Sequence, residues 1–164
     1  MFYKDYLNAA RKHKYTCCVL REKLDSLDEN KDKAKYKSLL LNLYYLSGYI
    51  IECIVKYGIY DLIGYPKNKA VSELEEKGLT YQNNIKHHRF ERYTEQLNKR
   101  MSGAIPLVDG HKKDIDKKVI QLYKEWDAEV RYSYDLGKNE KHHYIAFYEY
   151  AEKIFEIIIN NVRG

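Results

Sequence analysis

An arginine and two histidines near the C-terminus are the side chains of this sequence best suited to chemistry on a phosphate. Arg131 precedes His142 and His143, and the intervening segment SYDLGKN (133–139) contains Gly137 and predicts a helix break. A histidine can exchange protons near neutral pH, and an arginine can stabilise negative charge on a phosphate. If the chain folds back at the break, a metal-independent phosphodiester-cleaving site could form from Arg131 with His142 or His143.

Two tyrosines next to this arginine suggest binding rather than catalysis. Tyr132 and Tyr134 could stack on bases or hydrogen-bond a phosphate, alongside Arg131, His142 and His143. Packing at a helix end is the alternative interpretation of the two tyrosines. These five residues are therefore the candidate surface for RNA or for a partner protein.

The other pair of adjacent histidines, His87 and His88, raises the question of a metal. Neighbouring residues on a helix point about 100° apart, so each His-His pair offers at most one good ligand. The spacing identifies no third or fourth ligand, and no phosphate-binding glycine loop or catalytic triad order occurs. We therefore predict neither a metal site nor a cofactor.

The elements that must position these residues are helices. Apolar residues recur at helical spacing in five segments, approximately 2–27, 34–62, 84–102, 114–130 and 140–162. A capping pattern formed by Ser72 and Glu75 predicts a further short helix before Gly78. No alternating strand pattern is evident, so we predict one all-α domain over residues 1–164, a five-helix bundle with the second helix at its centre.

A carboxylate lies within the most apolar of these segments, LLLNLYYLSGYIIECIVK (39–56). An unpaired charge among buried helices would cost several kcal/mol, so Glu52 needs a partner or access to solvent. Lys56, one helical turn later, is one candidate partner, and such a pair on an exposed edge would contribute only about 0.3–0.5 kcal/mol. Glu52 and Lys56 are thus candidate structural polar residues.

Composition sets broad limits on the environment of the protein. The net charge of +5 permits an anionic partner, although the lysines are spread along the chain. The odd number of cysteines, two of them adjacent, fits neither a disulfide framework nor a zinc pattern and predicts buried, reduced thiols. The charged N-terminus is unlike a signal peptide, and polar residues interrupt the apolar segment. We therefore expect a cytoplasmic protein that does not span a membrane.

Three pieces of the sequence resemble the HEPN (higher eukaryotes and prokaryotes nucleotide-binding) domain family. The central helix is similar to the family pattern small-Gly-aromatic-x-x-Glu-Cys-x-x-Lys, which Ser47, Gly48, Tyr49, Glu52, Cys53 and Lys56 match in order. Further along, His88, Phe90, Tyr93 and Leu97 resemble its His-x-Leu-x-x-Leu helix start. Its Trp…Glu-hydrophobic-Arg-Tyr-Ser element is matched by Trp126, Glu129, Val130, Arg131, Tyr132 and Ser133.

The resemblance implies a function for the protein and a second candidate partner for Glu52. It implies a Glu52–Arg131 pair, a homodimer or hetero-oligomer, and a role with RNA in prokaryotic defence, stress response or toxin–antitoxin systems. Many HEPN proteins are metal-independent RNases with an Arg-x(4–6)-His motif, but none of the six histidines here follows an arginine at that spacing.

From this departure we expect an HEPN-like protein that binds RNA or a partner protein without robust RNase activity. A metal-independent RNase using Arg131 with His142 or His143 is one alternative. A helical adaptor with no nucleic-acid contact is the other.

Overall fold

The computed structural model describes residues 1–101 and 115–162. The loop predicted over 102–110 and the predicted start of the fourth helix at residue 114 lie outside the described residues. Within them, α-helices dominate and the strands are minimal, so the predicted all-α bundle is confirmed.

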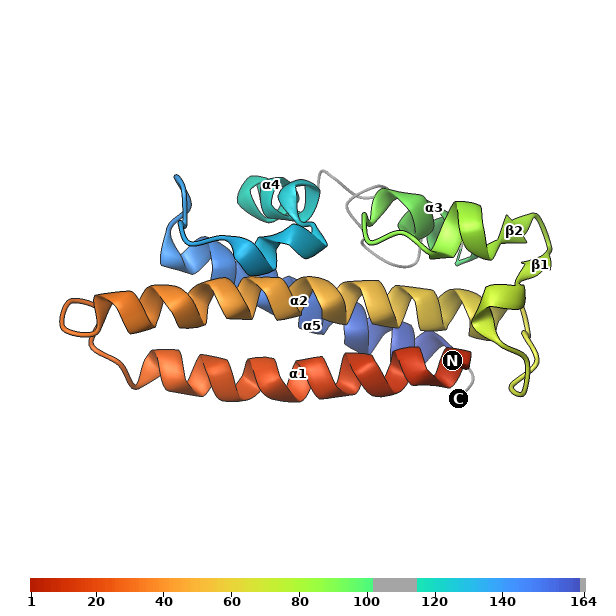
Figure 1. Ribbon diagram of the computed structural model, residues 1–164, viewed down its shortest axis with the longest axis horizontal. Helices are drawn as coiled ribbons and strands as arrows, with labels where there is room; N and C mark the ends of the chain where they lie inside the picture. Colours follow the sequence, from red (N-terminus) through yellow and green to blue (C-terminus); the bar gives the residue numbers. More distant parts are fainter. Residues whose placement is uncertain (102–114, 163–164) are drawn as a thin grey trace.

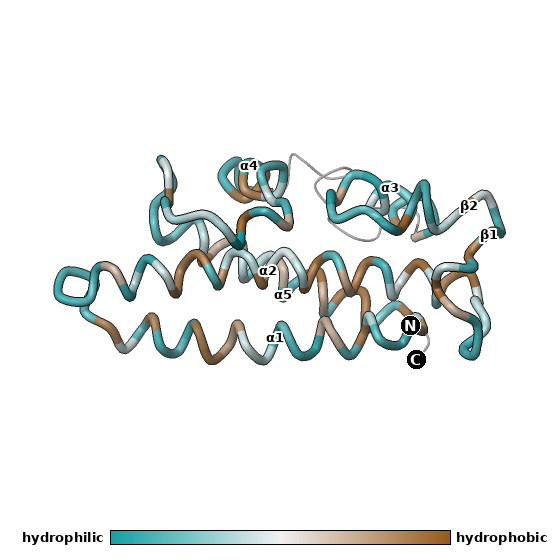
Figure 2. Tube along the Cα trace, in the orientation of Figure 1, coloured by the Kyte–Doolittle hydropathy of each residue, from teal (hydrophilic) through white to brown (hydrophobic). Residues whose placement is uncertain are grey.

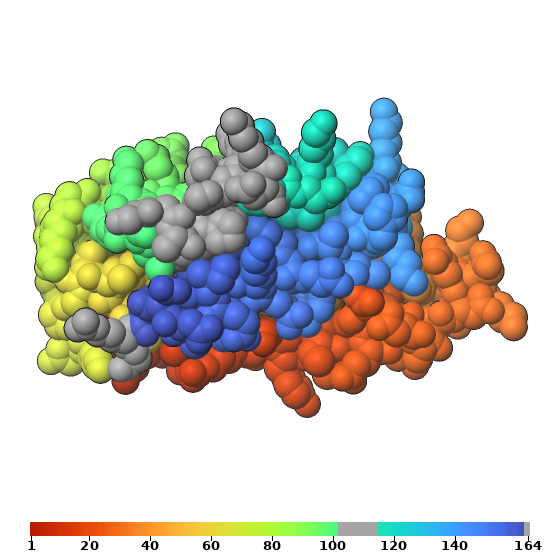
Figure 3. Space-filling model, turned by 180° about the vertical axis from the view of Figure 1, so that it is seen from behind, coloured from red at the N-terminus to blue at the C-terminus, as the bar shows by residue number. Residues whose placement is uncertain are grey.

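Three long helices form the body of the molecule. The central helix α2 (Lys33–Leu62) lies between α1 (Tyr3–Asp25), which runs alongside it, and α5 (Lys141–Asn161), which covers it from behind (Figure 1). The opposite view shows α5 across that face, with α1 along its edge (Figure 3). The short helices α3 (Glu91–Arg100) and α4 (Lys117–Glu125) pack over the remaining side.

The middle and end of α2 form the centre of the core. Every residue from Ile50 to Tyr60 is buried, because the segment is apolar on nearly all sides and contacts the other layers (Figure 2). By length and composition alone α2 could also cross a membrane, but 61% of its most apolar window is buried inside the fold. Here the apolar surface is covered by the chain's own helices.

The connection after α2 contains the first departure from the predicted elements. The predicted short helix is only a 3₁₀ turn (Val71–Glu73), followed by a hairpin of β1 (Glu75–Glu76) and β2 (Leu79–Thr80). Lys77 and Gly78 both have positive φ, 53° and 75°, as a tight primed hairpin turn requires. Gly78 therefore closes a hairpin rather than ending a helix, and the expectation of no strand was wrong at this position.

The third predicted helix is shorter than its periodicity suggested. A π-helical turn (Tyr81–Ile85) is followed by an irregular segment, and α3 begins only at Glu91. Thr80 fixes the start of the π turn, since its Oγ1 accepts a hydrogen bond from the backbone of Asn83 at 3.2 Å. His87 and His88 therefore lie on a connecting loop and not on a helix.

The fourth predicted helix is divided in two. After α4, Trp126 adopts an extended backbone conformation, and a 3₁₀ helix, η4 (Ala128–Tyr132), follows. The side chain of Asp127 accepts a hydrogen bond from the backbone of Glu129 at 3.0 Å and so starts the new helix. The break therefore separates Trp126, which follows α4, from Arg131 in η4.

The cysteines only partly match the expectation of buried thiols. Cys17 and Cys53 are buried, and burial raises the pKa of each thiol to about 12. Cys18 is exposed on α1. The position of Cys18 directly after Cys17 on a helix accounts for this, because adjacent residues point in different directions.

Candidate functional site

A buried ion pair forms the centre of the candidate site. The Lys56 ammonium donates to Glu52 Oε1 at 2.8 Å, with side-chain exposures of 3% and 6%. The prediction of Lys56 as the partner is therefore right, but the pair is buried and does not lie on an exposed edge. The alternative partner, Arg131, was wrong, because η4 places it with other side chains.

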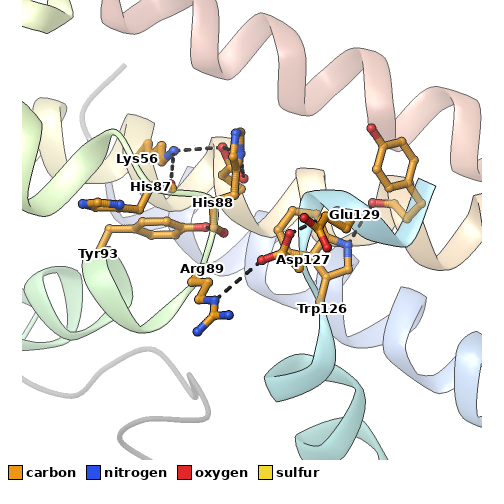
Figure 4. Close-up of polar contacts among 10 residues, drawn as sticks. Lys56, His87, His88, Arg89, Tyr93, Trp126, Asp127 and Glu129 are labelled. Atoms are coloured by element: carbon orange, nitrogen blue, oxygen red, sulfur yellow. Dashed lines mark hydrogen bonds and ion pairs between the residues drawn. The ribbon is translucent and has the colours of Figure 1, made fainter. Parts of the chain in front are cut away.

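Lys56 has a complete set of partners in this position. Its ammonium also donates to the backbone carbonyl of His87 at 2.8 Å and lies 4.9 Å from the centre of the Tyr93 ring (Figure 4). A buried cation needs such contacts to offset the loss of water. The lysine thus ties the loop that carries His87 and His88 to the central helix.

His88 shares the carboxylate of Glu52 with Lys56. Its Nδ1 lies 3.1 Å from Oε2 and 3.2 Å from Oε1 of Glu52. An ionised carboxylate only accepts hydrogen bonds, so Nδ1 carries a hydrogen and Nε2 is the nitrogen that remains for another molecule. The side chain is 51% exposed. The arrangement is a solvent-accessible imidazole held by a buried carboxylate.

The partners of His88 shift its proton affinity. The hydrogen bond to Glu52 is the largest effect and raises the pKa above its usual value of 6.5, while partial burial and Lys56 oppose this. A raised folded-state pKa means that protonated His88 stabilises the fold at pH values below 6.5. This contribution disappears as the pH rises through the folded pKa.

We therefore predict that His88 titrates in the folded protein with a pKa above 6.5. In Glu52→Gln the pKa should fall, because the neutral amide removes the hydrogen bond to a charge. NMR titration of the imidazole resonances measures both values. Equal pKa values for His88 in both proteins would contradict this assignment.

A second histidine approaches the same place from α1. The ring of Tyr49 lies 5.5 Å from that of His13 and 6.1 Å from that of His88. Burial, followed by the charge of Lys12, lowers the pKa of His13. Two partly exposed imidazoles with opposite pKa shifts therefore lie near one tyrosine. Because His13 and His88 are far apart in the sequence, no spacing pattern predicted this.

Arg131 lies at the edge of a neighbouring pocket. A cavity of about 350 Å³ lies between the first half of α2 and the segment around η4. It is lined by Ala34, Lys37, Ser38, Leu41, Asn42, Tyr45, Val130, Arg131, Ser133 and Tyr134. The guanidinium lies 4.7 Å from the centre of the Tyr132 ring and shares a hydrogen bond with the Tyr45 side chain. Three members of the predicted binding surface, Arg131, Tyr132 and Tyr134, are thus brought together here.

The remaining two members have different contacts. His143 Nδ1 accepts a hydrogen bond from the backbone of Glu140 at 3.0 Å, which caps the start of α5, and His142 Nδ1 lies 3.4 Å from the Glu140 carboxylate. In the contacts of the described residues, neither imidazole meets Arg131. His143 therefore stabilises the start of α5, whose N-cap is Glu140.

A metal site would need several ligands close together. Across residues 1–101 and 115–162, no group of three or more His, Cys, Asp or Glu side chains is arranged to hold an ion. Comparisons of the chain with protein-family models, with curated proteins and with solved structures found no match.

Proposed function

We propose that this protein binds single-stranded RNA in the pocket between α2 and η4. The observation that carries the proposal is the lining of the pocket, where Arg131 and Lys37 lie with Tyr45 and Tyr134 around a cavity of about 350 Å³. Cations that follow a phosphate backbone and aromatic rings that stack on bases are the two components of single-strand recognition.

The exposure of the tyrosines supports a binding surface at this pocket. Tyr134 is 88% exposed and Tyr132 is 66% exposed, so neither contributes to the packing of the described core. Exposed aromatic rings beside a guanidinium are suited to bases, because every base has a face on which a ring can stack. The packing interpretation of these two tyrosines is therefore less favourable than the binding interpretation.

The HEPN resemblance supports the same proposal. His88 and Trp126, which are among the residues that carry that resemblance, pack against Tyr49, and Tyr49 packs against Tyr45 at the pocket. The dimer or hetero-oligomer and the defence, stress or toxin–antitoxin role remain proposals from the resemblance. A partner protein on the same surface is the competing proposal.

Tyr134→Ala is predicted to weaken binding of a fluorescent single-stranded RNA by about 5- to 150-fold, equivalent to about 1–3 kcal/mol for one lost base stack. Fluorescence anisotropy at fixed salt measures the affinity. Tyr15→Ala is the matched control, because Tyr15 is 74% exposed on α1, away from the pocket. The control should bind as the wild type does.

Arg131→Ala adds a test of charge. If the guanidinium contacts one phosphate, its loss should reduce the slope of log affinity against log salt by about 0.7. Arg92→Ala on the surface of α3 should leave the slope unchanged. A wild-type protein that fails to bind RNA even at low salt would overturn the RNA proposal and favour the adaptor.

A further inference from the structure

A second cavity adjoins the pocket between α2 and η4. It has a volume of about 210 Å³ and lies between α2, the end of α4 and the segment that joins η4 to α5. Three residues, Leu41, Val130 and Ser133, line both cavities. A strand that places one base in the pocket therefore has room for a neighbouring base in the second cavity.

The polar lining of the second cavity differs in charge from that of the pocket. Its charged residues are Glu125 and Asp135, and among the described residues that line it there is no lysine, arginine or histidine. Its two tyrosines, Tyr44 and Tyr144, already donate their hydroxyl hydrogens to backbone carbonyls, at 2.6 and 2.8 Å. The second cavity therefore favours a ligand that presents N–H groups and disfavours a phosphate.

An unsatisfied acceptor in the same lining indicates the same ligand chemistry. Oδ1 of Asn139 is buried and accepts no hydrogen bond within the described part of the chain. Buried acceptors normally have a donor, from the protein or from water. The lining is thus rich in acceptors and short of the donors that a ligand would supply.

Glu125 is the acidic residue best placed to contact such a ligand. Its Oε1 accepts a hydrogen bond from Nε2 of Gln121 at 2.8 Å, which holds the carboxylate at the C-terminal end of α4. Burial and then the charge of Glu125 raise the pKa of Tyr44, so the carboxylate lies near that wall of the cavity. The residue is also exposed. A ligand can therefore reach a fixed carboxylate that only accepts hydrogen bonds.

The four RNA bases present different groups to a carboxylate. Guanine has two neighbouring donors on its Watson–Crick edge, N1–H and the 2-amino group, which match the two oxygens of a carboxylate. Adenine and cytosine have an acceptor nitrogen beside their amino group, and uracil has one N–H between two carbonyls. Each of these three bases would turn an acceptor towards the negative charge.

We propose that the second cavity binds guanine, whose N1–H and 2-amino groups donate to the carboxylate of Glu125. The inference rests on the proposed RNA binding and gives that surface a sequence preference. The pocket holds one base of the strand by stacking, and the second cavity selects the base beside it.

The experiment compares strands that differ in one base. The probes are fluorescent uridine strands whose central nucleotide is guanosine, inosine, adenosine, cytidine or uridine, measured by fluorescence anisotropy at fixed salt. Wild-type protein should bind the guanosine strand about 5- to 150-fold more tightly than the adenosine, cytidine or uridine strand, as expected for one bidentate contact. Inosine keeps N1–H but lacks the 2-amino group, so its strand should bind less tightly than the guanosine strand.

Glu125→Gln tests the carboxylate without disturbing the core, because Glu125 is exposed at the end of α4. An amide offers one donor and one acceptor, a pair that every base can match. The ratio of guanosine to adenosine affinity should therefore fall towards one, whereas the uridine strand should bind at least as tightly as before. Glu95→Gln on α3 removes the same charge from a side chain that is 60% exposed, and it should keep the wild-type ratio.

The outcomes separate the two proposals. Equal affinity of the wild type for all the strands would overturn the guanine inference and leave the RNA-binding proposal intact. Failure of every strand to bind would overturn the RNA-binding proposal itself. A guanosine preference that survives Glu125→Gln, that is lost in Glu95→Gln, or that inosine reproduces in full would overturn the assignment of guanine to this carboxylate.

Discussion

Glu52→Ala is expected to lower the free energy of unfolding by about 3–5 kcal/mol, because it leaves the ammonium of Lys56 buried without its counter-charge. The lysine side chain is only 3% exposed, and its remaining polar partner is the carbonyl of His87. His88 would lose its carboxylate in the same variant. Urea unfolding monitored by circular dichroism measures the change.

The chain contains a close geometric control for this pair. Glu95 and Lys99 on α3 have the same four-residue spacing and an oxygen–nitrogen distance of 2.7 Å, but both side chains are at least 60% exposed. Glu95→Ala should therefore cost well under about 1 kcal/mol. The double variant Glu52→Ala, Lys56→Met should recover much of the loss, since no charge is then left buried. A loss below about 1 kcal/mol in Glu52→Ala would show that Lys56 reaches water.

The central helix illustrates what the sequence could predict. The apolar periodicity located α2 to within a residue at its start, and burial from Ile50 to Tyr60 follows from the absence of a polar face. The same reasoning identified Glu52 as a charge that needs a partner, and Lys56 was among the candidates because i and i+4 residues share a helix face. What local spacing could not supply was the depth of burial, which depends on the loop that covers the pair.

The histidine pair shows why the rest of the site could not be predicted. His13 and His88 both lie near Tyr49 only because α1 packs along α2 and the loop after the π turn is bound to Glu52 and Lys56 of α2. No pattern within one helix encodes that meeting. In contrast, the grouping of Arg131, Tyr132 and Tyr134 could be predicted, because they are near neighbours in sequence. Contact between Arg131 and His142 required the chain to fold back between them, and η4 and the cap of α5 do not adopt that geometry.

The close packing of Trp126 on Gly48, next to Tyr49, gives the second large expected effect. A Cβ atom on residue 48 would lie 1.9 Å from Cε2 of Trp126, much closer than atoms in contact allow. The indole cannot easily retreat: it is 2% exposed, stacks on Phe90 at 4.7 Å, and its Nε1 donates to the carbonyl of Tyr45 at 3.2 Å. Glycine is thus required here by close packing on the indole.

Gly48→Ala is therefore predicted to destabilise the fold by about 1–3 kcal/mol or more, the usual cost of overpacking. This outweighs the gain of about 1 kcal/mol that alanine normally brings to a helix interior. Gly58→Ala is the comparison on the same helix, because its Cβ would lie 3.1 Å from Cγ2 of Ile158, 3.3 Å from Cδ1 of Leu97 and 3.8 Å from Cγ1 of Val162, so its neighbours need to move much less. Gly58→Ala should therefore destabilise the fold less than Gly48→Ala, and both are measured by urea unfolding.

A double-mutant cycle assigns the cost to the indole. In a Trp126→Leu background, where the smaller side chain leaves space above residue 48, Gly48→Ala should cost less than it does in the wild type. Equal costs in both backgrounds would mean that the strain arises elsewhere. Because Trp126 also packs edge-on against Tyr49 at 5.1 Å, its displacement in Gly48→Ala should disturb the Tyr49 ring, which packs edge-on against His88. Loss of stability and a change in the titration of His88 are therefore expected together in this variant and not in Gly58→Ala.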